Sequence, residues 1–281
     1  MNSKSVLQII LRNIFFRTKL IFLLQFLFFY NGVLEAQWVQ TNGPRIGTYI
    51  TCIATKGDDI FACNDDAIYR SKNAGASWDM LNFGPSYLYS ITSIAIRDSN
   101  IYLGTDGGGV YLSTNYGTNW SPVNNGLDYP YVFSVAVCDT VVYAGTHHNG
   151  GVYRTDNNGT SWALAGLANY GVWSLAVSGT TIYAGTEYGV YFSADRGTTW
   201  QSISEGLPDT NIVISLGISG SNIYAGTYRK GLYVSTNNGN SWTKSNIAMG
   251  NIRVNSININ GNNIFVGTGV GLYWSTDNGT T

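Results

Sequence analysis

The chain has 281 residues, of which 11% are charged and 14% are aromatic; it has 34 glycines, 5 prolines and a formal net charge of −1. The apolar content is ample for a core, which argues against intrinsic disorder. No basic cluster follows residue 36, which argues against a nucleic-acid partner. Few charges, many aromatic side chains and glycine at turn frequency favour an all-β protein made of short strands.

The first 36 residues predict a signal peptide. An apolar run over residues 20–30 follows four basic residues, Lys4, Arg12, Arg17 and Lys19, and the small residue Ala36 precedes the expected cleavage site. The run is shorter than the roughly 20 apolar residues that span a bilayer. We therefore expect residues 1–36 to be removed and residues 37–281 to be secreted, extracellular or periplasmic, with no membrane span in the mature chain. A retained membrane anchor is the alternative.

The three cysteines do not form a disulfide framework. Cys52 and Cys63 flank a turn over residues 56–59 and could face each other in a hairpin, while Cys138 is far away in the sequence. Buried thiols are the simpler interpretation because the geometry of a cross-strand disulfide is demanding. The sequence leaves both alternatives open.

The sequence repeats itself from about residue 50 to its end. A serine or cysteine that follows a valine or isoleucine by two residues recurs at spacings of 40 or 41 residues, as Cys52, Ser93, Ser134, Ser174, Ser215 and Ser256. Within the fourth copy, four short segments read as strands joined by turns: residues 172–177, 181–185, 189–193 and 200–203. Such a unit predicts blades arranged around a ring. The expected fold is an all-β propeller of four-stranded antiparallel blades, with almost no helix after residue 36. Six blades are visible, and seven in the intact protein is the alternative.

Each copy contains a segment with Ser or Thr first, Asn or Asp third, Gly fifth and Trp last. These segments, the box turns, are Ser71–Trp78, Ser113–Trp120, Thr155–Trp162, Ser193–Trp200 and Ser235–Trp242, and a sixth begins at Ser275. The Asn or Asp can accept hydrogen bonds within its own turn, the glycine permits a positive φ, and the tryptophan can pack between blades. We expect all five tryptophans to be mostly buried.

The box turns resemble the BNR or Asp-box repeat, S-x-D-x-G-x-T-W, and the resemblance covers nearly all of residues 37–281. Asp-box propellers include sialidases, xyloglucan-degrading hydrolases, sortilin-type receptors and the photosystem II assembly-factor family. The resemblance therefore implies a fold and a structural role for the box turns at the blade periphery, and it does not select one function.

Both ends of the repeat array bear on ring closure. Residues 38–40 (Trp-Val-Gln) align with residues 200–202, so we expect them to form a fourth strand that completes the last blade and covers its edge. The last copy stops at Thr281, one residue before its expected tryptophan. We expect a longer intact protein, whose missing C-terminal region could attach it to the cell surface.

Candidate ligand-binding residues lie in segments that differ from copy to copy. In a four-stranded blade, the loops between the second and third strands share one face with the blade-to-blade connections, opposite the box turns. Aromatic rings stack on sugars or peptide groups, and nearby polar groups fix their orientation. Loop padding in an aromatic-rich protein is the alternative. The candidates are Tyr87, Asp106, Tyr129, Tyr170, Trp173, Glu187, Tyr188, Tyr228 and Arg229.

These residues suggest an extracellular glycan or protein as the partner, or a scaffold role, without a cofactor. A glycoside hydrolase of sialidase-like or xyloglucanase-like type is the alternative, since Asp65, Asp66, Asp106 and Glu187 could supply a carboxylate pair. The sialidase signature Arg-Ile-Pro is absent, because Gly47 stands where proline belongs. We assign no catalytic residue. We assign no metal either, since His147 and His148 are expected to point opposite ways on the surface. An assembly factor for a membrane complex is a third class, implied by the resemblance alone.

Overall fold

The computed structural model describes residues 43, 49–65, 67–84, 89–208, 212–245 and 250–279. The chain divides into two compact units, Met1–Thr41 and Asn42–Thr281, and every described residue belongs to the second. No helix in these ranges is long and apolar enough to cross a membrane.

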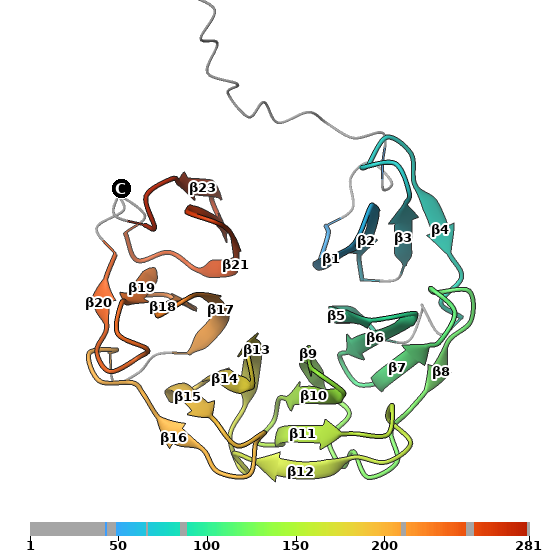
Figure 1. Ribbon diagram of the computed structural model, residues 1–281, viewed down its shortest axis with the longest axis horizontal. Coiled ribbons are helices and arrows are strands. Elements are labelled where there is room, and N and C mark those ends of the chain that lie inside the picture. The colour runs from blue at the N-terminus through green and yellow to red at the C-terminus, as the bar shows by residue number, and fades with distance from the viewer. Residues whose placement is uncertain are drawn as a thin grey trace, which may run out of the picture. The chain divides into compact units, whose positions relative to one another are not determined.

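The second unit is an all-β propeller of six blades, as the repeat predicts (Figure 1). Blade 1 contains β1 (Cys52–Lys56), β2 (Asp59–Cys63), β3 (Ile68–Ser71) and β4 (Asp79–Leu81). Blade 2 contains β5 (Ile91–Arg97), β6 (Asn100–Thr105), β7 (Gly109–Ser113) and β8 (Ser121–Pro122). Blade 3 contains β9 (Val132–Cys138), β10 (Val141–Thr146), β11 (Gly151–Thr155) and β12 (Ala163–Gly166).

The other three blades repeat this arrangement. Blade 4 contains β13 (Val172–Ser178), β14 (Thr181–Thr186), β15 (Gly189–Ser193) and β16 (Gln201–Ser202). Blade 5 contains β17 (Val213–Ser219), β18 (Asn222–Thr227), β19 (Leu232–Ser235) and β20 (Thr243–Lys244). Blade 6 contains β21 (Val254–Asn260), β22 (Asn263–Thr268) and β23 (Gly271–Ser275). The strands of each blade pair antiparallel in chain order, and no helix occurs among the described residues. The predicted role of residues 38–40 in blade 6 concerns residues outside the described ranges and stays a prediction.

One bulge recurs near the start of the inner strand of five blades. In blade 4, Val172 pairs with Thr186 and Ser174 pairs with Gly185, so Trp173 is an extra residue with no partner of its own. A bulge of this kind redirects a side chain out of the regular alternation of the strand. The equivalent extra residues in blades 2, 3, 5 and 6 are Thr92, Phe133, Ile214 and Asn255.

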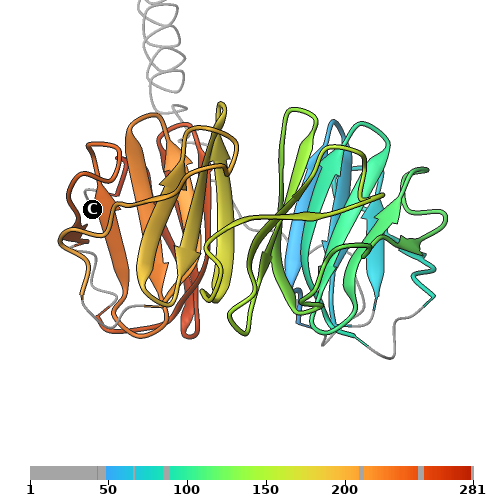
Figure 2. The same cartoon turned by 90° about the horizontal axis from the view of Figure 1, so that it is seen from below.

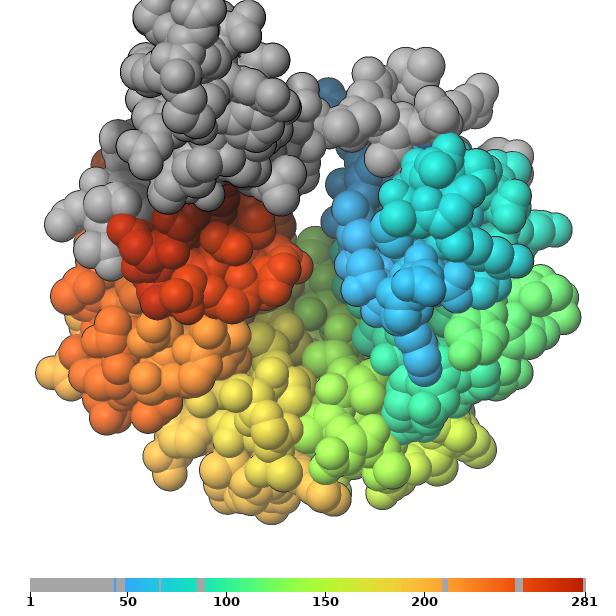
Figure 3. All heavy atoms as spheres, turned by 45° about the horizontal axis from the view of Figure 1, so that its top comes forward, coloured from blue at the N-terminus to red at the C-terminus, as the bar shows by residue number. Residues whose placement is uncertain are grey.

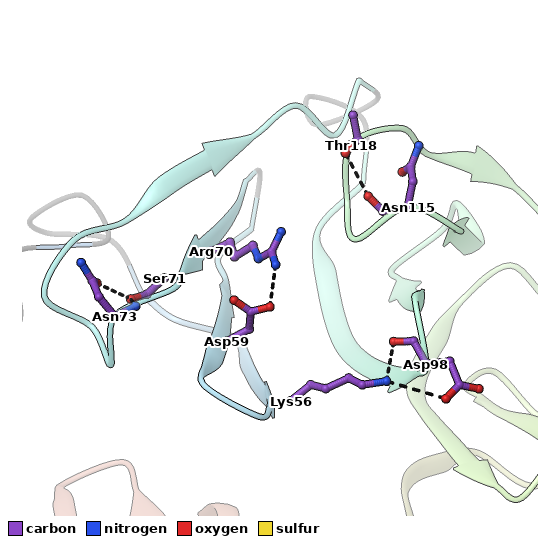
Figure 4. Close-up of polar contacts among 8 residues, drawn as sticks. All are labelled: Lys56, Asp59, Arg70, Ser71, Asn73, Asp98, Asn115 and Thr118. Carbon is purple, nitrogen blue, oxygen red and sulfur yellow. Dashed lines mark hydrogen bonds and ion pairs between the residues drawn. The ribbon is translucent and has the colours of Figure 1, made fainter.

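The box turns are held by hydrogen bonds within each turn. In the first, the Ser71 hydroxyl donates to Asn73 Oδ1 at 3.0 Å and accepts from the Gly75 N–H at 2.8 Å. Figure 4 shows Ser71 with Asn73, and Thr118 with Asn115 in the second box turn. Gly75 has a φ of 86°, which a residue with a side chain rarely adopts. The same contacts recur in the sixth copy, where Ser275 donates to Asp277.

In blades 2 to 5, the box-turn tryptophans lie against the preceding blade. Trp162 and Trp242 are buried, and their indole N–H groups donate to the carbonyls of Val123 and Ile203. Trp78, Trp120 and Trp200 are half-buried. The expectation of mostly buried rings is therefore met fully by two of the five tryptophans and partly by three, and none is exposed.

Successive blades are also joined through buried tyrosines of their second strands. Tyr102, Tyr143 and Tyr224 are fully buried, and each hydroxyl bonds to the box turn of the next blade, on Asn158 Oδ1, Arg196 O and Asn278 O. The inner strands of successive blades pack side by side from β1 to β21. Figure 3 shows the blades following one another in chain order, from blue to red.

Candidate functional site

One face of the propeller carries the loops between second and third strands, and each is bonded to a blade-to-blade connection. The N–H groups of Asp106, His147 and Tyr228 donate to the carbonyls of Ser90, Tyr131 and Ile212, each at 2.9 Å. The box turns lie at the opposite ends of the strands, where the Tyr116 N–H donates to the Ser99 carbonyl in the first turn of its blade. Figure 2 shows loops at both edges of the ring. We call the loops between second and third strands, together with the blade-to-blade connections bonded to them, the rim loops.

An aromatic cluster lies where the rim loops of blades 3 and 4 meet. The His147 ring is 4.3 Å from Trp173 and 5.0 Å from Phe133, and Phe133 is 5.2 Å from Trp173, between ring centroids. His148 adds a ring 4.5 Å from His147 and another contact, at 4.5 Å, with Tyr131. Phe133 and Trp173 are bulge residues of adjacent blades, so the bulges bring them together. We call these five residues the His147 cluster.

The His147 cluster contains two buried ring nitrogens that no described residue satisfies. His147 Nδ1 and Trp173 Nε1 are both buried and have no hydrogen-bond partner among the described residues. A buried donor left unpaired costs about 1–3 kcal/mol. Burial, together with repulsion from His148, lowers the pKa of His147, although the charges of Glu187 and Asp106 act in the opposite direction. The imidazole is therefore mostly neutral at pH 7.

Glu187 lies against the cluster through a glycine. The Gly171 N–H donates to Glu187 Oε1 at 3.2 Å. A Cβ added at Gly171 would lie 2.9 Å from Glu187 Oε2 and 3.3 Å from His147 Cδ2. Glycine at position 171 thus permits the carboxylate and the imidazole to approach the same point of the backbone.

Two smaller aromatic groups lie elsewhere on the rim loops. Tyr170 contacts both Tyr188 and Tyr191, with 5.3 Å between centroids in each case. Burial, followed by the hydrogen bond and repulsion from the Tyr170 phenol, raises the pKa of Tyr191 to about 12. In blades 5 and 6, the guanidinium groups of Arg229 and Arg253 lie 5.1 and 4.9 Å from the Tyr228 ring centroid. Both distances are within the range of a cation–π interaction.

The predicted site residues therefore fall into several groups. Trp173 and Glu187 lie beside His147, and Asp106 pairs with Tyr131 in an isolated β-bridge. Tyr170 groups with Tyr188, and Tyr228 with Arg229. Tyr129, which is 38% exposed, packs beside Gly150. Tyr87 lies outside the described residues.

Of the five residues of the His147 cluster, only Trp173 is among the predicted site residues; the other four are Tyr131, Phe133, His147 and His148. The prediction of a surface pair of histidines pointing opposite ways is wrong, because the two rings are in contact and His147 is half-buried. The segment is not extended there, since His148 has a φ of 54°. Phe133 was not a candidate, yet it occupies the same repeat position as Trp173, directly before the recurring serine. No group of three or more potential metal ligands occurs among the described residues.

The fold and its loops define a β-propeller whose repeat-to-repeat variation lies on the rim loops. A family model for the DUF6242 beta propeller domain matches residues 82–223, just over half of the sequence. The chain belongs to this family. No curated protein matches the sequence.

Several solved structures share the fold. The extracellular domain of BT4673 from B. thetaiotaomicron superposes with a TM-score of 0.70 and 21% identity, over 85% of this chain and 34% of that one. The chain thus spans about a third of that protein's length. YCF48 bound to D1 peptide superposes with a TM-score of 0.64 and 12% identity, over 85% of this chain and 81% of that one. The GH74 xyloglucanase from Xanthomonas campestris superposes with a TM-score of 0.64 and 16% identity, over 82% of this chain and 45% of that one. At these identities the likeness shows the fold alone.

Proposed function

We propose that this protein is an exported binding protein of the BNR or Asp-box type, which recognises an extracellular glycan or protein segment through its rim loops. The observation that carries the proposal is the His147 cluster, where two buried nitrogens lack partners beside exposed aromatic and acidic groups. A ligand can contact the exposed Tyr131 and His148 rings directly. Trp173 Nε1 is closed to solvent, so a ligand acceptor would remove the cost of that unpaired donor only after the cluster rearranges.

The chemistry of the cluster favours a ligand with a flat face and several polar groups. Tyr131 is 39% exposed and offers its ring to the solvent beside His148. Asp106 and Glu187 can accept hydrogen bonds from hydroxyl or amide N–H groups. Glycans and peptide segments both have this combination, and the similar structures include a protein bound to a peptide and a xyloglucanase.

Export of the mature chain is part of the proposal. It is supported by the N-terminal sequence pattern and by the likeness to an extracellular domain. N-terminal sequencing of the protein recovered outside the cytoplasm tests it, and the expected first residue is Gln37. Recovery of a chain that keeps residues 1–36 would show a retained anchor instead.

The binding test uses Trp173→Ala and Glu187→Gln against a matched control, Ile214→Ala. Ile214 occupies the same bulge position as Trp173, one blade further on, outside the His147 cluster. On an array of glycans and extracellular peptides, we expect both cluster variants to lose about tenfold or more in affinity, whereas the control keeps the affinity of the wild type.

A box-turn variant, Thr199→Ala, separates binding from stability. In the wild type, the Thr199 hydroxyl donates to Asp195 Oδ2 at 2.6 Å on the face opposite the rim loops. Loss of this hydrogen bond should lower the melting temperature slightly and leave binding unchanged. If Thr199→Ala lost the ligand at unchanged stability while Trp173→Ala kept it, the ligand would bind the box-turn face and not the rim loops.

Glycoside hydrolysis is the second candidate, favoured by one observation. Asp106 and Glu187 come from different blades, and the charges of both act on His147. A glycoside hydrolase needs two carboxyl groups about 5–9.5 Å apart, and these two residues are the candidates for that pair. Release of reducing sugar from xyloglucan oligosaccharides, abolished by both Asp106→Asn and Glu187→Gln, would establish this function over binding alone.

A further inference from the structure

Blade 1 differs from the other blades at one pair of facing residues. In blades 2 to 6, a serine of the inner strand pairs with a glycine of the second strand, as Ser93–Gly104, Ser134–Gly145, Ser174–Gly185, Ser215–Gly226 and Ser256–Gly267. In blade 1 the same two positions hold Cys52 and Cys63, which pair directly. Both positions therefore differ in blade 1, where two cysteines replace the serine and the glycine of the other blades.

In four of these five blades, the serine side chain lies very close to the facing glycine, and Gly145 of blade 3 is the exception. The serine Oγ lies 2.5 Å from a Cβ placed on Gly104, 2.4 Å from one on Gly185 and 2.1 Å from one on Gly226. Because Oγ is bonded directly to the serine Cβ, the two Cβ positions are at most one C–O bond length further apart. A disulfide has a Cβ···Cβ separation of about 3.5–4.5 Å, so two facing side chains at this position of the repeat are near enough to be bridged.

The two thiols of blade 1 interact with each other. Cys63 is fully buried and packs with Ile68 and Ile91, whereas Cys52 is half-buried and therefore more accessible. A hydrogen bond with Cys52, followed by burial, raises the pKa of the Cys63 thiol. Cys138 lies in blade 3, where its thiol is buried and contacts the Gly179 carbonyl, so it is remote from the pair.

We infer that Cys52 and Cys63 are a redox site, which forms a cross-strand disulfide when the protein meets a disulfide oxidant such as oxidised glutathione or a thiol–disulfide oxidoreductase. The Cys52 thiolate attacks the oxidant's S–S bond, forms a mixed disulfide and expels one thiolate. Cys63 then loses its proton and attacks Cys52 Sγ, which expels the second thiolate. The two cysteines lose two protons and two electrons, and the oxidant is reduced to two thiols.

The bond would join β1 to β2 in the first blade of the array. The inner strand of this blade is less buried than those of blades 2 to 5, since Ile53 of β1 is 62% exposed and those strands have no exposed residue. Closing the short loop between positions 52 and 63 restricts the unfolded chain and so stabilises the hairpin. This inference does not depend on the ligand of the rim loops.

The test exposes the full chain in native buffer to oxidised glutathione, followed by acid quenching, denaturation and alkylation. Mass spectrometry of a non-reduced digest should show one linked peptide pair containing Cys52 and Cys63, with alkylated Cys138. Reduction of the linked protein should then lower its melting temperature by about 5 °C or more.

The matched control is Cys52→Ser/Cys63→Gly, which recreates the pair found in the other five blades. This variant should fold, form no crosslink and lose the reductant-dependent shift in melting temperature, while Cys138→Ala should behave like the wild type. Full alkylation of Cys52 and Cys63 after oxidation, a mixed disulfide that persists on Cys52, or a bond from either residue to Cys138 would each overturn the inference.

Discussion

Leu232 of blade 5 and Leu272 of blade 6 occupy the same position of the repeat, each opposite the glycine of its second strand. Leu232 is 2% exposed, because it packs on Val254 and Ile264 of the next blade. Leu272 is 51% exposed. The equivalent residues of blades 1 to 4, Ile68, Val110, Val152 and Val190, are all fully buried. The difference in exposure between the two leucines therefore comes from the adjacent blade, which covers Leu232 and not Leu272, and not from the type of residue.

The glycines opposite these residues show the same contrast. A Cβ on Gly226 of blade 5 would lie 2.5 Å from Val254 of blade 6, whereas a Cβ on Gly267 of blade 6 would meet only its own Ser256. Trp274, two residues after Leu272, is also 51% exposed. A blade therefore folds its strands locally, but an adjacent blade must cover its apolar face, as in other repeat proteins.

The largest effect expected from this contrast is in stability. Leu232→Ala should lower the free energy of unfolding by about 2–4 kcal/mol, because it removes a buried side chain and leaves a cavity between two blades. Leu272→Ala removes the same atoms from a half-exposed site and should cost less than about 1 kcal/mol. Urea unfolding of the two variants measures both values.

Val190→Ala and Val152→Ala extend the comparison to blades 4 and 3, and both should resemble Leu232→Ala in direction. An equal loss of stability for Leu232→Ala and Leu272→Ala would contradict the comparison, since it would mean that the face of blade 6 is covered as well as that of blade 5.

A smaller effect should arise in the box turns, which do not differ between internal and terminal blades. Ser193 donates to Asp195 and Ser275 donates to Asp277, each at 2.7 Å. Hydrogen bonds from Thr199, through its hydroxyl and its N–H, and from Ser193 lower the pKa of Asp195 to about 2. The folded pKa lies below the ordinary value of 3.8, so this contribution to stability is present above that value. It is lost as the pH falls toward about 2.

Asp195→Asn should remove this acid dependence and preserve the turn, since asparagine occupies the same position in Asn73, Asn115, Asn157 and Asn237. Melting temperatures between pH 5 and pH 2 measure the effect, with Asp156→Asn as the control at an exposed neighbouring position of another box turn. The effect should be small, because the carboxylate is exposed to solvent. Identical acid profiles for wild type and Asp195→Asn would contradict it.

The fold was predictable because three local signals agree in every copy. The recurring serine or cysteine, the box turn and the strand-length apolar runs all have the same period, so each blade is specified several times over. The burial of individual residues was less predictable. Trp162 and Trp200 occupy equivalent positions in the sequence, yet one is buried and the other half-buried, since their packing depends on the neighbouring blade.

The candidate site was predictable as a set of loops and not as a set of contacts. The topology placed Trp173 and Glu187 on variable segments of blade 4, and the structure brings both to His147. The role of His147 itself depends on the backbone turn at His148 and on the bulge at Phe133. Neither follows from alternation along a strand, because each breaks that alternation.

The bulge gives this propeller a property useful for engineering. At one point of the inner strand in blades 2 to 6, an extra residue lies outside the ladder pairing, and these five blades hold threonine, phenylalanine, tryptophan, isoleucine and asparagine there. The backbone thus accommodates a hydroxyl, an amide, an aliphatic chain and two aromatic rings at equivalent places. Positions 92, 133, 173, 214 and 255 form a cyclic set of display sites, at which a combinatorial library could vary the side chains without altering strand register.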